Sequence, residues 1–240
     1  MQVYFDNAAT TKILPEAAKL MVNVMAEKYG NPSSASVLGI EADNVLKDAA
    51  KTVAGLINAK PEEVYFTSGG TESDNWAVFG SARGYAKSGR HMLYTSVEHP
   101  AVNRPFEVLK DEGYDIESIG VDSKGYIDIE ELKAKIRKDT IFAGVILINN
   151  ETGTIQDIEK IGKAVKEANP NTLFFVDAVQ AFGKYKIEVK KCGIDMLSAS
   201  GHKFNGPRGT GIFYINNSRN TIDLVLSEQQ KLLTNDGHGI

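Results

Sequence analysis

Lys203 stands alone in the segment LSASGHKFNGPRGTGIFYI, residues 197–215, between small residues and a glycine-rich turn. The apolar stretch before it is typical of a short buried strand, which puts the lysine at the mouth of a sheet. It is either one half of a solvated His202–Lys203 pair or a partly buried amine. Because desolvation lowers the pKa of an amine, the second alternative makes Lys203 a nucleophile towards carbonyl groups.

Asp177 closes the apolar run TLFFVDAV, and Gln180 follows three residues later, where it can face the same pocket. A carboxylate at the end of a buried strand needs a partner, because burying it unpaired is costly. The partner is either an ordinary cation or backbone amides, or the protonated nitrogen of a bound heterocycle.

The stretch SGGTES, residues 68–73, joins a predicted strand to a predicted helix. Glycines allow close backbone approach and a helix N-terminus offers free N–H groups, so Gly70 and Thr71 are candidate phosphate contacts. The alternative is that Thr71 and Glu72 only cap the helix. The spacing fits neither the dinucleotide fingerprint nor the Walker loop.

His99, in VEHP, is either a hydrogen-bonded loop histidine or a flat ring that stacks on a planar ligand. Cys192 precedes a strand at the end opposite the polar residues, which favours a structural or incidental thiol. The four histidines and this single cysteine lack the ligand spacing of zinc sites, so no metal centre is predicted.

The elements that must position these residues alternate along the chain. Helical patterns cover 14–30, 37–58, the residues after Gly70, 101–113, 127–139 and 157–169, and apolar strand patterns cover 62–66, 91–96, 140–149, 172–179 and 194–200. This order predicts an α/β fold with a mostly parallel sheet and helices on both faces.

Ligands of such sheets bind outside the carboxyl ends of the strands. Polar residues that follow five predicted strands are therefore expected to converge there: Thr71, His99, Asn150, Asp177, Gln180, Ser200, His202 and Lys203.

The composition narrows the functional class. The chain has 240 residues, 42% of them hydrophobic and 24% charged, with a net charge of -4. That charge gives no support for binding nucleic acid or an anionic membrane. One cysteine excludes an internal disulfide framework and suits a reducing compartment. With no secretory signal pattern and no apolar stretch of about 18 residues, the chain is expected to be cytoplasmic.

A phosphate cradle, an acid for a ring nitrogen, a stacking imidazole and a Schiff-base lysine together make the set that pyridoxal 5'-phosphate requires. The chain also resembles the NifS/IscS-type cysteine desulfurases, in the class V aminotransferase group of fold-type I pyridoxal phosphate enzymes. The resemblance runs over residues 3–215 and rests on VYFDNAATT, YGNPSSAS, FTSGGTESDN, EHPAV, NNETGTIQDI, VDAVQAFGK and LSASGHKFNGPRGTGIFYI.

The resemblance implies a role for each site residue. Lys203 holds the cofactor covalently and shuttles the substrate α-proton, and His99 stacks on the ring and assists proton transfer. Asp177 pairs with the ring nitrogen, while Gln180 and Asn150 contact the phenolic oxygen. The phosphate is held by Gly70, Thr71, Ser200 and His202. Asn7, Ala8 and Asn150 lie near the substrate.

The resemblance also implies a reaction and partners. L-cysteine is converted to L-alanine, and its sulfur passes through an enzyme persulfide to iron–sulfur clusters or thiocofactors. A homodimer and a sulfur-acceptor or scaffold protein are expected. The alternatives are a selenocysteine lyase or other class V enzyme, and a non-catalytic remnant that acts as an interaction module.

The predicted domain is a pyridoxal phosphate-binding α/β domain over 1–215, with an N-terminal helical arm over about 1–35. The family's C-terminal small domain, with its persulfide cysteine and its substrate-binding arginine, has no counterpart in this sequence. Residues 216–240 do not resemble the family's continuation, and we expect them to form a frayed tail.

Overall fold

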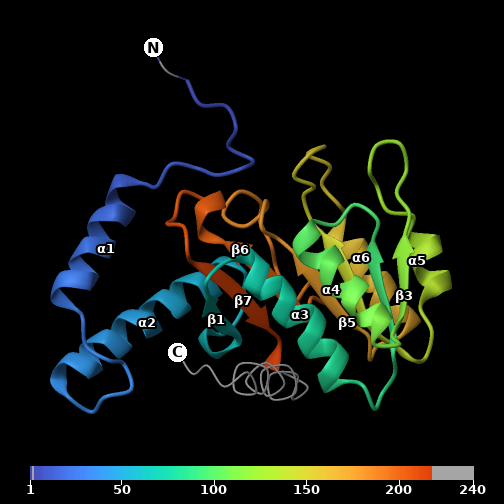
Figure 1. The fold of residues 1–240 in the computed structure, drawn as a ribbon, viewed down its shortest axis with the longest axis horizontal. Coiled ribbons are helices and arrows are strands. Elements are labelled where there is room, and N and C mark those ends of the chain that lie inside the picture. Colours follow the sequence, from blue (N-terminus) through green and yellow to red (C-terminus); the bar gives the residue numbers. More distant parts are fainter. Residues whose placement is uncertain (2, 218–240) are drawn as a thin grey trace.

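The computed structural model, which describes residues 1 and 3–217, has a seven-stranded sheet at its centre (Figure 1). The strand order is β1-β7-β6-β5-β4-β2-β3. The strands are β1 (Val64–Thr67), β2 (His91–Thr95), β3 (Asp115–Ile119), β4 (Thr140–Ile146), β5 (Leu173–Asp177), β6 (Met196–Ser200) and β7 (Gly211–Ile215). Strands β2 to β6 pair in parallel, and β7 runs antiparallel to both β1 and β6. The predicted α/β fold with a mostly parallel sheet is confirmed.

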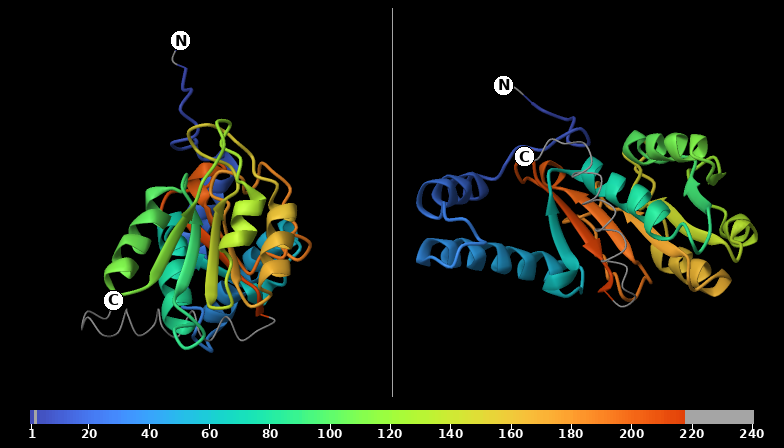
Figure 2. Two further views of the ribbon diagram at one scale, coloured as in Figure 1. Left: turned by 90° about the vertical axis from the view of Figure 1, so that its right-hand side faces the viewer. Right: turned by 60° about the horizontal axis from the view of Figure 1, so that its bottom comes forward.

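Helices cover both faces of the sheet, with α3 (Gly70–Gly84) and α4 (Pro100–Asp111) on one side and α5 (Ile129–Lys135) and α6 (Ile158–Ala168) on the other (Figure 2). Along β5, Phe174 and Val176 pack in the core under α5 and α6, whereas Leu173 and Phe175 pack under α3 and α4. A strand that is buried on both faces needs apolar residues at every position. This double burial is the reason for the continuous apolar runs in the sequence.

Two helices lie beyond β1, at the side of the sheet away from β3 (Figures 1 and 2). These are α1 (Pro15–Glu27), which has no buried residue, and α2 (Val37–Leu56), whose last turn reaches the core at Ala54. The Ser36 hydroxyl caps α2 by accepting a hydrogen bond of 3.1 Å from the N–H of Gly39. The predicted tail over 216–240 lies, apart from its first two residues, outside the described part of the chain.

The sequence missed strand β3 and overextended one helix. β3 is an edge strand that pairs only with β2 in the described sheet, and most of its residues are not fully buried, so it lacks an apolar run. The helix predicted over 127–139 ends at Lys135, because Ile136 adopts an extended conformation with φ -71° and ψ 121°. None of the helices in the described ranges has the length and apolar character needed to cross a bilayer.

Two helical glycines should respond in opposite ways to substitution by alanine. A Cβ on Gly162, in α6, would lie 1.9 Å from the carbonyl oxygen of Cys192, whereas a Cβ on Gly55, in α2, would meet no atom within 4 Å. Gly55→Ala should raise the free energy of unfolding by about 0.5–1 kcal/mol, the usual gain inside a helix. Gly162→Ala should lower it by about 2 kcal/mol or more, because backbone must move. Urea denaturation measures both, and equal stabilisation by the two changes would contradict this packing.

Candidate active site

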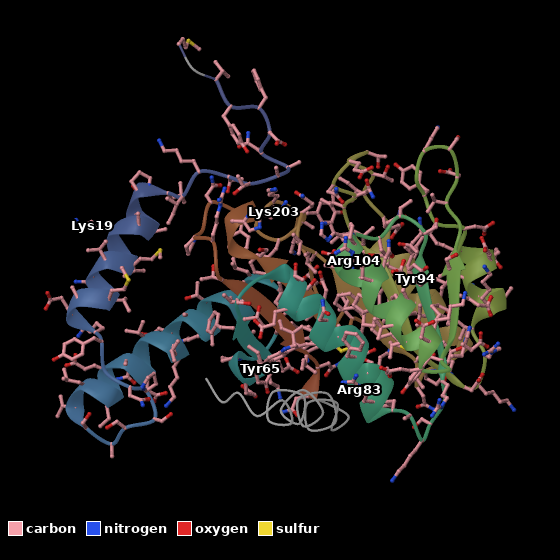
Figure 3. All side chains as sticks on the ribbon, viewed as in Figure 1. Lys19, Tyr65, Arg83, Tyr94, Arg104 and Lys203 are labelled. Atoms are coloured by element: carbon pink, nitrogen blue, oxygen red, sulfur yellow. The ribbon has the colours of Figure 1, made fainter. Side chains whose placement is uncertain are left out.

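A cavity of about 430 Å³ opens at the carboxyl edge of the parallel strands. Figure 3 shows Lys203 at this edge, near the N-terminal segment. The lining includes Asp6, Ala8, Ala9, Gly70, Thr71, Asp74, His99, Ile146, Asn150, Asp177, Val179, Gln180, Ser200, His202 and Lys203. Every residue that the sequence assigned to the cofactor is among them. Asn7, predicted to lie near the substrate, is exposed and is not part of this lining, although its neighbour Ala8 is.

Lys203 ends a single 3-10 turn, Gly201–Lys203, that follows β6 directly. Its Nζ donates hydrogen bonds to the carbonyl oxygens of Ala8 and, at 3.0 Å, of Ala9. Burial and then the charge of Lys184 lower the pKa of Lys203, although the charges of Asp177 and Asp6 act in the opposite direction. A lowered pKa gives the free amine a larger share at neutral pH, which is what attack on a carbonyl requires.

Asp177 is the last residue of β5 and is only 3% exposed. Its Oδ1 accepts a hydrogen bond of 2.9 Å from the N–H of Val179. Burial raises the pKa of Asp177 to about 6, while the Val179 N–H and the charge of Lys203 pull it down. The carboxyl has no ion-pair partner within 4.0 Å among residues 1 and 3–217, so a cation in the cavity would stabilise its charged form.

Two further buried carboxyls lie near Asp177, and the sequence did not single them out. Asp74, on α3, is 1% exposed, and Glu98, before α4, is 6% exposed. Oδ1 of Asp74 and Oε2 of Glu98 have no hydrogen-bond partner in the described part of the chain. Burial, and after it the charge of Asp177, raises the pKa of Asp74 well above its usual value and that of Glu98 to about 8. Glu98 is therefore mostly the neutral acid at pH 7, and the neutral form of Asp74 is favoured by the same two causes.

The sequence positions of Asp74 and Glu98, close to predicted ligand residues, could have indicated that both acids belong to the site. Asp74 lies three residues after Thr71 and so on the same face of α3, and Glu98 immediately precedes His99. A carboxyl beside a predicted ligand residue is common on surfaces, however, and only the fold shows that these two are buried.

His99 caps α4, where its Nδ1 accepts a hydrogen bond of 3.1 Å from the N–H of Ala101. This bond leaves the proton of the neutral ring on Nε2. Burial, followed by the charge of Lys203, lowers the pKa of His99. The site therefore presents a neutral imidazole whose orientation is fixed by the helix that it caps.

The start of α3 and the end of β6 form the candidate phosphate cradle. Gly70 begins α3 and packs so tightly that an added Cβ would lie 2.7 Å from Cγ2 of Val179 and 3.5 Å from Cβ of Ser200. The first N–H groups of a helix have no partner within it, and Gly70 and Thr71 line the cavity at that point. His202 completes this corner, with Nδ1 3.1 Å from the hydroxyl of Thr10.

Gln180 lies in the turn after β5. Its Nε2 donates a hydrogen bond of 2.8 Å to the carbonyl oxygen of Ala8, an oxygen that Lys203 also contacts. Asn150, from the loop after β4, lines the same cavity. The polar groups predicted from five strand ends are thus brought to one place.

Cys192 lines a different cavity, of about 490 Å³, together with residues such as Tyr126, Ile155 and Glu159. Burial raises the pKa of its thiol, which makes it a poor nucleophile. Among the described residues, His91, Asp115 and Glu117 bring ligand atoms within 4.8 Å of one another. The guanidinium of Arg137 contacts both of these carboxylates, so the group is an ion-pair network at the opposite end of the strands.

Comparison with known proteins identifies the family. Residues 3–223 match the family model of class-V aminotransferases. The chain belongs to this family. Within it the chain is IscS/NifS-like: it is 44% identical over 214 residues to cysteine desulfurase IscS of Methanosarcina thermophila, covering 89% of this chain and 52% of that protein. The chain thus spans about half the length of the curated relatives it matches.

Solved structures agree with this assignment. A NifS-like protein superposes with a TM-score of 0.88 at 40% identity, over 91% of this chain and 60% of that one. SspA in complex with cysteine gives a TM-score of 0.87 at 35% identity, over 91% of this chain and 62% of that one. The fold described above therefore corresponds to the large domain of NifS-like proteins.

The buried acid Glu98 should make stability depend on pH in a defined direction. Folding raises its pKa from 4.5 to about 8, so the unfolded chain ionises first and the protein loses stability as pH rises between these values. Glu98→Gln cannot ionise, and its side-chain oxygen can still accept from the N–H of Ile146. The difference in unfolding free energy between variant and wild type should grow, in favour of the variant, by on the order of 1–3 kcal/mol from pH 5 to pH 8.

Urea denaturation at several pH values measures this difference. The exposed Glu62 supplies a control, because Glu62→Gln should show no comparable trend. A difference that does not vary with pH would mean that Glu98 is already ionised in the folded protein.

Proposed function

We propose that this chain carries the pyridoxal phosphate site of a cysteine desulfurase. The observation that supports this most directly is the meeting of Lys203 and Asp177 in one cavity, in a chain whose family includes cysteine desulfurases. The SspA structure with cysteine supports L-cysteine as the substrate.

The residues of the cavity fit the cofactor. Asp177 is buried with no ion-pair partner in the described ranges, so a protonated ring nitrogen would supply the missing cation. Gly70 and Thr71 line the cavity at the start of α3, where the first N–H groups have no partner within the helix and would donate to a phosphate. Bound there, pyridoxal phosphate supplies an electron sink for the bonds of the substrate α-carbon.

The remaining chemistry falls to the side chains of the protein. Nζ of Lys203 would bond covalently to the cofactor, be displaced by the substrate amine, and then move the α-proton. Neutral His99 would stack on the ring and donate from Nε2, while Gln180 and Asn150 would orient the phenolic oxygen. Ser200, His202, Gly70 and Thr71 would hold the phosphate. Asn7 and Ala8 would lie near the substrate.

The sulfur step needs a thiol that faces the substrate. The C–S bond of L-cysteine breaks, the sulfur joins a thiol as a persulfide, and a proton takes its place to give L-alanine. Cys192, the single cysteine of the sequence, lines another cavity and has a raised pKa. The proposal therefore takes the acceptor thiol from outside these 240 residues.

We also propose that the protein works as a cytoplasmic homodimer that hands its sulfur to an acceptor or scaffold protein. The apolar side chains of α1, among them Leu20, Val22 and Met25, are exposed in this chain. Their exposure supports the proposal that a second subunit covers α1 in the homodimer. The selenocysteine lyase reaction is the second candidate, because the cavity side chains act on the α-carbon in either reaction. The position of Cys192 favours a third, a non-catalytic interaction module.

The decisive experiment is a visible spectrum of the purified chain with pyridoxal phosphate. Wild type should develop the visible absorbance of a lysine-bound cofactor, and Lys203→Ala should not. Lys186→Ala is the matched control, because Lys186 is 80% exposed and pairs only with Glu188 among the described residues. A wild-type chain without absorbance would refute the proposed function.

Adding substrate then separates the candidate reactions. Alanine formed from L-cysteine in the presence of a small thiol supports a desulfurase, and alanine formed only from L-selenocysteine supports the lyase. Absorbance without alanine from either substrate would mean a site that binds the cofactor but is incomplete in this chain, whereas no absorbance would leave the interaction module as the remaining candidate.

Asp177 should govern cofactor affinity. Asp177→Asn keeps the shape of the side chain and its acceptor for Val179 but removes the charge that would pair with the ring nitrogen. We expect the Kd for pyridoxal phosphate to rise about tenfold or more, as for loss of one partner from a buried pair. Absorbance titration measures it, and an unchanged Kd would show that Asp177 does not pair with the cofactor.

A further inference from the structure

The N-terminal segment, residues 6–14, is fastened to the loop that carries Lys203. Thr11 makes the central contacts: its N–H and its hydroxyl donate to the carbonyl oxygen of His202 at 2.8 and 2.9 Å. The same hydroxyl accepts a hydrogen bond of 2.7 Å from the N–H of Asn205. One threonine side chain thus joins both ends of the segment 202–205. Thr11 and His202 are 191 residues apart in the sequence.

Neighbouring contacts keep this junction in register. The N–H of Leu14 donates to the carbonyl oxygen of Asn205 at 3.0 Å, and Nδ2 of Asn205 donates to the carbonyl oxygen of Lys12 at 2.9 Å. Asn205 has a φ of 65°, a left-handed conformation that asparagine tolerates better than most residues. The loop is therefore shaped to receive the N-terminal segment.

We call the hydrogen bonds of Thr11 with His202 and Asn205 the clasp. The segment that the clasp fastens places two backbone carbonyls in the site. The oxygens of Ala8 and Ala9 accept the hydrogen bonds of Lys203 Nζ, and the oxygen of Ala8 also accepts from Gln180. An ammonium has three donors and no acceptor, so carbonyl oxygens suit its charged form. Hydrogen bonds to a charged form favour that form over the neutral one.

We propose that Thr11 is a positioning residue, whose clasp holds the carbonyls of Ala8 and Ala9 as the docking site of the free Lys203 ammonium. The inference rests on the proposed function, in which Lys203 must leave a covalent bond and later return to it. The two carbonyls keep the released amine within the cavity during that interval. The hydrogen bonds of the Thr11 hydroxyl go to backbone groups of His202 and Asn205, so Thr11 acts through the segment that it fastens.

Several other titratable groups face Lys203, and the test must separate their effects from that of Thr11. They come from the N-terminal segment, β5, the turn after β5, the start of α4 and the 3-10 turn: Asp6, Asp177, Lys184, His99 and His202. Substituting Thr11 changes none of these side chains, but Asp6 lies on the segment that Thr11 fastens and its charge acts on Lys203. The Thr11 variants are therefore compared in an Asp6→Asn background, where a change in the titration of Lys203 reports the carbonyl site.

The experiment compares Thr11→Val, which keeps the shape without the hydroxyl, with Thr11→Ser, which keeps the hydroxyl. Competitive labelling by acetic anhydride over a pH series, read by mass spectrometry of the peptide that contains Lys203, gives the pKa of this lysine without any cofactor. Thr11→Val should lower that pKa by about half a unit or more, because the ammonium loses its acceptors. Thr11→Ser should titrate as the Asp6→Asn protein.

A folded Thr11→Val protein with the pH profile of the Asp6→Asn protein would overturn the proposal, as would a serine variant that behaves like valine. If Thr11→Val does not fold, Lys203→Met tests the same contact from the other side. Amides of residues 8–10 should then exchange faster with deuterium than in wild type, while the Lys186→Met control leaves them unchanged; unchanged exchange in Lys203→Met would refute the docking site. A wild-type chain that fails to bind pyridoxal phosphate would refute the proposed function and leave these two readouts intact.

Discussion

The buried carboxyl of Asp177 is the constraint on which the rest of the site depends. It stands at the end of a strand covered on both faces, where a charge without a partner is unfavourable. Burial raises the pKa of Asp177 to about 6, although the hydrogen bond from the N–H of Val179 acts to lower it. A cation must approach from the cavity if the carboxylate is to stay ionised at all pH values near neutrality. The need for a cation beside this carboxylate also bears on the acids and the lysine around it.

The acids around Asp177 limit how much negative charge the pocket can hold. Asp74 and Glu98 are as buried as Asp177, and each has an oxygen with no partner in the described part of the chain. Burial, and after it the charge of Asp177, disfavours their charged forms, which raises the pKa of Asp74 well above its usual value and that of Glu98 to about 8. Of the three buried acids, Asp177 is the one whose pKa, at about 6, lies below neutral pH, and Asp6 also lines the cavity.

Much of this architecture could be predicted from the sequence, for physical reasons that differ by element. Strands such as β5 are buried on both faces and so appear as apolar runs, and the residues after them, such as Asp177 and Lys203, must meet at one edge of a parallel sheet. β3 was missed because an edge strand needs no apolar run. Asp74, Glu98 and the clasp at Thr11 were missed because their importance lies in burial and in contacts between distant segments.

The contact between Thr11 and the loop 202–205 shows why such features need the folded chain. Local pattern can place a lysine after a strand, but the acceptors of its ammonium come from Ala8 and Ala9, at the other end of the sequence. Burial and Lys184 favour the neutral amine, whereas the two carbonyls, Asp177 and Asp6 favour the ammonium. Under the proposed function this lysine alternates between a covalent bond and a free state. The contributions to its pKa act in opposite directions, and the N-terminal segment supplies two that favour the ammonium: the carbonyls of Ala8 and Ala9 and the charge of Asp6.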